Sequence, residues 1–196
     1  FVSMDNCSHN GERIRQAFLT FASAWEAKGY TDKGFTAYIE EKTAFPYSMI
    51  DKIVPGPSPK VQSYLKECGF ADTEYIKAGR STYALFVNAA PQEYLVIEDT
   101  FPNGRPPLEK AGVIFTDRET VNQCERMKVG TCLNPLHTAL AVYGCLLGYV
   151  KISDEIRDPQ LKGLIEKIGY DEGLPVVVNP GVLNPKAFID ELLEQS

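Results

Sequence analysis

The 196-residue sequence contains few of the residues that mark a metal site, a disulfide framework or a nucleic-acid surface. It has two histidines and no CxxC or HxxxH pair, so no metal is expected. Cys124, Cys132 and His137 lie close together, but cysteines are commonly buried as small hydrophobic residues. The five cysteines are odd in number and irregularly spaced, which favours reduced thiols. A net charge of −6 argues against a nucleic-acid partner.

Long apolar runs and nucleotide-binding motifs are also absent. The longest apolar run, residues 138–149, is shorter than the roughly 20 residues that span a bilayer, so no membrane association is expected. The sequence contains no G-x-G-x-x-G, G-x-x-x-x-G-K-[ST] or G-x-S-x-G motif. No secretory signal follows Phe1, which predicts a cytoplasmic protein, and the start in mid-pattern indicates a piece of a longer chain.

What the sequence does contain is a change of composition near residues 103–116. Strand formers before it predict strands at 83–87 and 94–98 around a turn at 88–92, either paired with each other or parts of a mixed sheet, and a last short strand follows at 112–115. The fold class is therefore α+β and predominantly α-helical. Apolar residues at helical spacing predict helices over residues 12–27, 36–43, 58–68, 117–128, 138–149, 154–168 and 185–193.

A stretch of polar residues, Glu125 to His137, leads directly into the apolar segment 138–149. We expect that segment to be a buried helix whose leading edge carries the polar residues into the interior. Glu125 and Lys128 are three residues apart and share a helical face, with a solvated ion pair as the ordinary alternative. A lysine desolvated in a pocket can act as a general acid or base, and Glu125 can relay its proton to water.

Three further polar side chains and one carboxylate are candidates for a site. Asn134 before Pro135 is typical of a helix cap, and His137 in the first turn would be a neutral imidazole that bonds a substrate hydroxyl, or else a core histidine. Asn10 is either a cap or a second amide that completes an oxyanion hole with Asn134. Asp51 is either a loop cap or an acceptor for a substrate hydroxyl.

Five blocks of the sequence, which occur in the family's order, resemble the polyol-specific long-chain dehydrogenases. This is the family of mannitol dehydrogenase, fructuronate reductase and tagaturonate reductase. The blocks are Ser3-Met4-Asp5-Asn6 with Asn10-Gly11, Phe45-Pro46 with residues 49–55, Ile97-Glu98-Asp99 with Phe101, residues 104–109, and residues 125–137. They cover the chain from residue 1 to about residue 150.

The resemblance implies NAD(P)-dependent hydride transfer, without a metal, between a secondary alcohol of an open-chain sugar derivative and its ketone. It also implies the roles of individual residues: Lys128 as general acid/base, Glu125 as the gate for proton exchange, Asn134 and Asn10 as the oxyanion hole, His137 as a substrate-binding residue and Asp51 as part of the substrate pocket. The residues that bind the cofactor are not identified in this chain.

The sequence departs from the family pattern in two ways. The usual spacing puts the asparagine five residues after the lysine, whereas Asn134 follows Lys128 by six, so one residue between Val129 and Leu133 is expected to bulge out. The family's amino-terminal dinucleotide fingerprint and its carboxy-terminal substrate-binding arginine do not occur here. The rest of the cofactor domain and a carboxy-terminal segment of the same enzyme are therefore expected partners.

We therefore predict two regions. Residues 1–112 would be the carboxy-terminal part of an NAD-binding, Rossmann-type domain, and residues 113–196 a truncated helical substrate domain. The predicted substrate is a small polyol or sugar acid, of the mannitol/fructose or mannonate/fructuronate type. The alternatives are a non-catalytic helical binding or assembly module, and a sugar-phosphate dehydrogenase of the mannitol-1-phosphate type.

Overall fold

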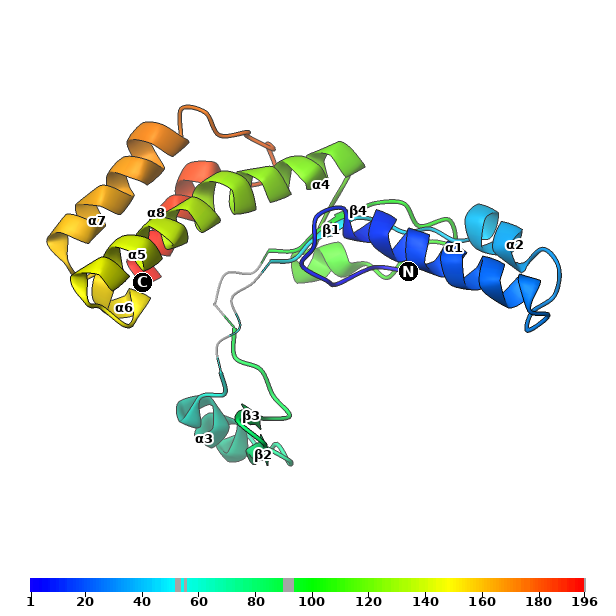
Figure 1. Cartoon of the computed structure of the whole chain (residues 1–196), viewed down its shortest axis with the longest axis horizontal. Helices are drawn as coiled ribbons and strands as arrows, with labels where there is room; N and C mark the ends of the chain where they lie inside the picture. The colour runs from blue at the N-terminus through cyan, green and yellow to red at the C-terminus, as the bar shows by residue number, and fades with distance from the viewer. Residues whose placement is uncertain (52–53, 55, 90–93, 196) are drawn as a thin grey trace. The chain divides into compact units, whose positions relative to one another are not determined.

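The structure is a computed structural model that describes residues 1–51, 54, 56–89 and 94–195. The chain divides into two units, one of residues 1–50 with 94–196 and the other of residues 51–93. The larger unit holds a three-stranded sheet and most of the helices, and the smaller unit holds one helix and a β-hairpin (Figure 1).

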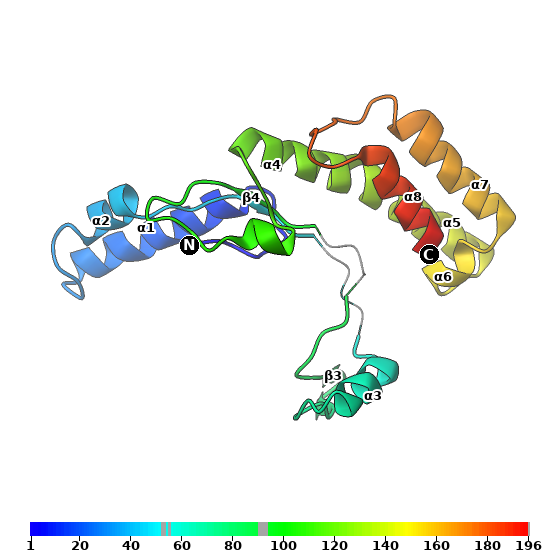
Figure 2. The same ribbon diagram turned by 180° about the vertical axis from the view of Figure 1, so that it is seen from behind.

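The amino-terminal helices α1 (Asn10–Ala27) and α2 (Phe35–Lys42) pack against each other, as Figures 1 and 2 both show. Their apolar faces meet in a small cluster formed by Ala22, Ile39 and Phe45. The structure confirms both predicted helices to within two residues, because their apolar residues recur at helical spacing.

A three-stranded sheet leads from these helices into the rest of the larger unit. β1 (Ser48–Met49) pairs antiparallel with β4 (Val96–Glu98), and β4 pairs in parallel with β5 (Ile114–Thr116). Of the two predicted arrangements, the pairing of residues 83–87 with 94–98 is therefore wrong, whereas residues 96–98 do belong to a mixed sheet. Every residue of β4 is buried, so it is the central strand and takes both of its neighbours from other segments.

The smaller unit contains α3 (Pro59–Glu67) and a β-hairpin of β2 (Ile76–Ala78) and β3 (Ser81–Tyr83). The predicted helix at 58–68 is confirmed. The hairpin lies just before the strand predicted at 83–87, and residues 90–93 of the predicted turn lie outside the described residues.

The remaining part of the larger unit is helical. In Figures 1 and 2, α8 lies against the long helix that runs from α4 into α5. None of the helices in the described ranges is long and apolar enough to cross a bilayer. The elements are the 3-10 helix η1 (Leu108–Ala111), α4 (Arg118–Glu125), the π-helix η2 (Arg126–Leu133), α5 (Asn134–Leu147), α6 (Ile152–Glu155), α7 (Pro159–Glu166), the π-helix η3 (Lys167–Gly173) and α8 (Pro185–Gln195).

The helix α4 continues through η2 into α5 without a break. The prediction that Asn134 caps a new helix is therefore wrong: Leu133 precedes α5, no side-chain cap bond forms there, and Asn134 already has helical backbone angles. A cap is not needed at this point, because the preceding helical turn supplies carbonyl acceptors for the amides that follow.

The helix predicted over residues 154–168 is divided into α6 and α7. Asp158 ends the first part and caps the second, since its Oδ1 accepts bonds from the backbone N–H groups of Gln160 (2.8 Å) and Leu161 (3.3 Å). Pro159 occupies the first helical position, where its missing N–H costs nothing. Asp158 and Pro159 thus mark a helix boundary that the apolar spacing did not indicate.

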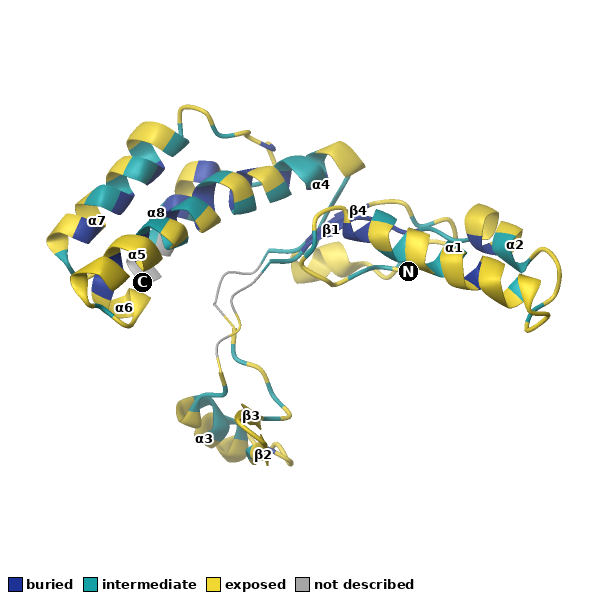
Figure 3. Cartoon of the chain, in the orientation of Figure 1, coloured by how far each residue is buried: buried dark blue, intermediate teal, exposed yellow. Residues whose placement is uncertain are grey.

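The helix α5 is buried along one stripe only, so the predicted fully buried helix is wrong. Leu136, Leu140 and Gly144 face the core. Val142 and Leu146 are 52% and 77% exposed, and Figure 3 shows an exposed side along this helix. The sequence of α5 is apolar on every side. Among the described residues, however, neighbours pack against only one side of this helix.

An ion pair between a buried carboxylate and a half-exposed guanidinium joins the sheet to α4. Glu98 of β4 is 5% exposed, and its carboxylate accepts bonds from the Arg118 Nε (3.1 Å) and the Tyr47 N–H (3.0 Å). The Arg118 guanidinium also lies over the Tyr47 ring at 4.3 Å. These contacts fix where the long helix starts relative to the sheet.

Two of the cysteines are exposed to solvent and two are buried. Burial raises the pKa of Cys124 and of Cys132 to about 11, whereas Cys68 and Cys145 are exposed. At about pH 8 we expect a thiol reagent to label Cys68 and Cys145 rapidly and the two buried thiols only on unfolding, because the thiolate is the reactive form. Peptide mass spectrometry of labelled protein, with and without denaturant, measures this. Equal labelling rates in native protein would contradict the burial described here.

Candidate active site

Lys128 is buried in η2 between two aromatic rings. Its side chain is 1% exposed, and its Nζ lies 4.3 Å from the centre of the Tyr94 ring and 5.7 Å from that of Phe188. The two rings meet edge-on, with their centres 5.7 Å apart. Tyr94 comes just before β4 and Phe188 belongs to α8, so three segments far apart in the sequence enclose the amine.

Glu125 ends α4 one helical turn before Lys128. It is half-buried, and its Oε1 accepts a hydrogen bond from the Ser8 hydroxyl of the amino-terminal segment. Glu125 is therefore partly open to water, as a group that exchanges protons with water must be. Its predicted partnership with Lys128 stays a prediction, and Ser8 is a contact that sequence spacing gave no sign of.

The extra residue between Lys128 and Asn134 is taken up by the π-helix η2. Each hydrogen bond of a π-helix closes a turn that contains one residue more than an α-helical turn. The inserted residue therefore widens the helix over Arg126–Leu133, instead of leaving the helix as the expected bulge. Six residues that include a widened turn cover about the same rotation as five in an α-helix. The direction of Asn134 relative to Lys128 is thus kept close to that of the family spacing.

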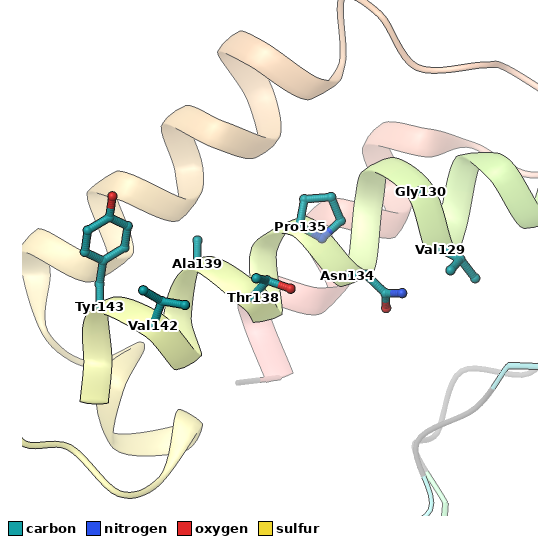
Figure 4. A pocket seen from close by; sticks show the side chains of 8 residues that line it. All are labelled: Val129, Gly130, Asn134, Pro135, Thr138, Ala139, Val142 and Tyr143. Carbon is teal, nitrogen blue, oxygen red and sulfur yellow. The ribbon is translucent and has the colours of Figure 1, made fainter. Parts of the chain in front are cut away.

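Asn134 is exposed and lines an open hollow of about 470 Å³ on η2 and α5 (Figure 4). Thr138 follows one turn later on the same side and adds a hydroxyl group, which no sequence motif had indicated. Asn134 faces this hollow, whereas Lys128 lies in the interior. The hollow is lined by Val129, Gly130, Asn134, Pro135, Thr138, Ala139, Val142 and Tyr143.

His137 lies half-buried on α5, one residue before Thr138. It therefore stands on the same helix as Asn134, one turn further on, and it is not among the residues that line the hollow. Its predicted role in binding substrate stays a prediction.

Asn10 is buried at the start of α1 and bonds to the backbone of two other segments. Its Nδ2 donates to the carbonyls of Asp5 (2.9 Å) and Ser48 (3.0 Å), and its Oδ1 accepts from the Ser48 N–H (3.1 Å). These bonds hold β1 and the amino-terminal segment in place. The predicted oxyanion-hole role of Asn10 stays a prediction.

Asp51 belongs to the smaller unit and is half-buried. Lys128 belongs to the larger unit, so the predicted place of Asp51 in a pocket with Lys128 stays a prediction. Within the described ranges, no group of three or more histidine, cysteine, aspartate or glutamate residues is placed to hold a metal.

The chain was compared with known protein families. Residues 1–110, more than half of the chain, match the mannitol dehydrogenase Rossmann domain. The chain belongs to this family. The predicted family is confirmed, and the matched residues include β1, β4 and the amino-terminal helices, of which α1 holds Asn10.

Individual relatives cover nearly the whole chain. It is 52% identical over 195 residues to a D-mannonate oxidoreductase of Thermotoga maritima, and 32% identical over 194 residues to a polyol:NADP oxidoreductase of Gluconobacter oxydans. These alignments cover 98% and 99% of this chain but 36% of each relative. This member of the mannitol dehydrogenase family therefore spans about a third of the length of these relatives.

Two solved structures share the fold. A crystal structure of D-sorbitol dehydrogenase in substrate-free form superposes with a TM-score of 0.78 at 30% identity, over 98% of this chain and 36% of that one. Pseudomonas fluorescens mannitol 2-dehydrogenase, in a ternary complex with NAD and D-mannitol, gives 0.70 at 29% identity, over 99% and 36%. The predicted fold class, helical with a few strands, is confirmed.

Proposed function

We propose that this chain is part of an NAD(P)-dependent oxidoreductase that interconverts a sugar acid and its keto form, of the mannonate/fructuronate type. Lys128, enclosed by two aromatic rings in a chain of the mannitol dehydrogenase family, is the observation that carries the proposal. The choice of a sugar acid over a simple polyol is supported by the 52% identity to a D-mannonate oxidoreductase.

Lys128 is proposed to move the proton of the reacting hydroxyl group. Burial disfavours the ammonium form of a lysine, so a buried amine gives up its proton more readily than one in water. In the oxidation direction the neutral amine takes the hydroxyl proton, and in the reduction direction the ammonium returns it. Glu125, half-buried and held by Ser8, passes the proton between Lys128 and water.

Asn134 and His137 are proposed to orient the substrate. The Asn134 amide in the open hollow can donate to the oxygen that becomes negatively charged, which is the function of an oxyanion hole. Asn10 and Asp51 keep their proposed roles as second amide and pocket residue, and Asn10 would have to offer an N–H beyond its bonds to the backbone.

The dinucleotide, when bound, accepts or supplies the hydride. This chain has no G-x-G-x-x-G loop to hold a pyrophosphate, so its residues do not by themselves form a dinucleotide site. We therefore propose that residues 1–112 complete a cofactor domain begun elsewhere in a longer enzyme, and that residues 113–196 belong to the substrate domain.

The hollow argues against the sugar-phosphate alternative. Of the residues that the structure describes, the eight that line it include no lysine or arginine, and a phosphate group is generally bound by such cations or by a helix N-terminus. A non-catalytic module is disfavoured by the relatives, which are named as oxidoreductases and dehydrogenases.

A substrate panel tests the proposed function. We expect the full-length enzyme to oxidise mannonate with a kcat/KM at least about tenfold above that for mannitol, since a site built for polar groups rejects analogues that lack them. The 196-residue chain alone is expected to show no turnover. NADH and NADPH formation is followed with mannonate, altronate, mannitol and mannitol phosphate. Turnover of the phosphate ester alone, or clear turnover by the isolated chain, would contradict the proposal.

A further inference from the structure

We infer that Tyr94, supported by Phe188, is a positioning residue that holds the amine of Lys128 in place for proton transfer. This inference rests on the proposed function, because it concerns how the proposed general acid/base is held. Tyr94 acts through Lys128 and is not assigned a contact with the substrate.

The contact has the geometry of a cation lying over an aromatic face. The Lys128 Nζ is 4.3 Å from the Tyr94 ring centre, inside the roughly 6 Å range over which a ring attracts an ammonium group. The side chain is 1% exposed, so water screens this attraction very little. Phe188 adds a second ring at 5.7 Å and meets Tyr94 edge-on.

An aromatic ring can hold a proton-transfer lysine without taking its proton. The ring face attracts the ammonium form of the amine, and it offers no basic atom to which the proton could move. Tyr94 can therefore fix the position of the amine while the proton moves between the amine, the substrate and Glu125.

Tyr94 also connects two parts of the larger unit. Two residues after it, β4 begins with Val96, which is fully buried, while Lys128 and Phe188 come from the helical region. The position of the amine is thus tied both to the sheet and to α8. A change at Tyr94 is expected to alter proton transfer without removing any group that binds substrate.

Several other titratable groups lie on η2 and on the elements packed against it. Ser8 bonds Glu125, and the imidazole of His137 lies on α5. Burial raises the pKa of Cys124 and Cys132 to about 11. Among the described residues of these elements, the charged pairs are Arg118–Glu98, Arg126–Glu119, Lys167–Asp171 and Lys186–Asp190, and Tyr170 donates to Asp190.

A series at position 94 in the full-length enzyme tests the inference. We expect Tyr94→Leu to lower kcat roughly tenfold with KM changed less than about twofold, since the lost attraction affects proton transfer and not binding. Tyr94→Phe keeps the ring and is expected to stay within about twofold of wild type. In the pH profile of kcat/KM for oxidation, Tyr94→Leu is expected to shift the rising limb to lower pH, because the ammonium form loses support.

The controls separate the possible outcomes. Tyr75→Leu makes the same change in the ring pair of Tyr75 and Phe86 in the smaller unit and is expected to leave kcat and the pH profile unchanged. If Tyr94→Leu does not fold, Phe188→Leu is expected to show the same effects at smaller size. If Lys128→Met is inactive but Tyr94→Leu has a normal kcat and pH profile, the inference about Tyr94 is wrong and the proposed function stands. An active Lys128→Met enzyme overturns the proposed function itself.

Discussion

Replacing Lys128 with methionine is expected to lower kcat of the full-length enzyme by about a thousandfold, the middle of the range for a general acid/base. The same change is expected to alter the free energy of unfolding by no more than about 1 kcal/mol, because methionine fills a similar volume in the buried site. Loss of activity without loss of stability is what distinguishes a catalytic lysine from a structural one.

Steady-state kinetics and thermal unfolding of the same preparations measure both parts of this prediction. Lys167→Met is the matched control, since Lys167 is 66% exposed and pairs with Asp171 on the surface. It is expected to keep full activity, because exposed pairs contribute little. A Lys128→Met enzyme with kcat within about tenfold of wild type would mean that another group moves the proton.

Replacing Gly11 with alanine is expected to destabilise the protein by about 3 kcal/mol, at the upper end for overpacking. A Cβ atom there would lie 2.4 Å from the Phe45 carbonyl oxygen and 2.8 Å from that of Pro46. Both are backbone atoms, so the contact can be relieved only by moving α1 away from the segment that leads into β1. Asn10 would move with α1, and its bonds to Ser48 would be strained.

Replacing Gly163 with alanine is expected to have the opposite effect on the stability of the protein. Gly163 lies in α7, and apart from the helix itself and the chain neighbours no atom comes within 4 Å of the point that a Cβ would occupy there. Alanine there is expected to raise stability by about 0.5–1 kcal/mol through helix propensity. Unfolding of both variants is followed by circular dichroism. A Gly11→Ala protein as stable as wild type would show that α1 and residues 45–46 are not in close contact.

Local patterns were sufficient to predict most helices but not the sheet. The helices α1, α3 and α8 follow from apolar spacing, glycine and proline within each segment. β1 is only two residues long, and β4 pairs in parallel with β5 across a segment that includes η1. Strand pairing depends on contacts between distant segments, which periodicity along one segment does not contain.

The residues of the candidate site were likewise predictable from local sequence patterns only in part. The burial of Lys128 follows from its place next to an apolar helical segment, and its partnership with Glu125 stays a prediction from their spacing. Tyr94 and Phe188 could not be selected, because nothing in their own segments indicates that their rings meet the lysine. The expected burial of α5 failed for a related reason: an apolar sequence shows what a helix can bury, not which neighbours are present to cover it.

The widened turn at Arg126–Leu133 has a consequence for how this chain is compared with other sequences. An insertion within a straight helix rotates every later residue by about 100°, whereas an insertion that forms a π turn leaves the later residues facing almost as before. The alignment gap against a relative with the five-residue spacing therefore belongs between Val129 and Leu133. Placed there, the gap keeps Asn134 and His137 opposite their counterparts, and evolution could add the residue without rebuilding the face that bears them.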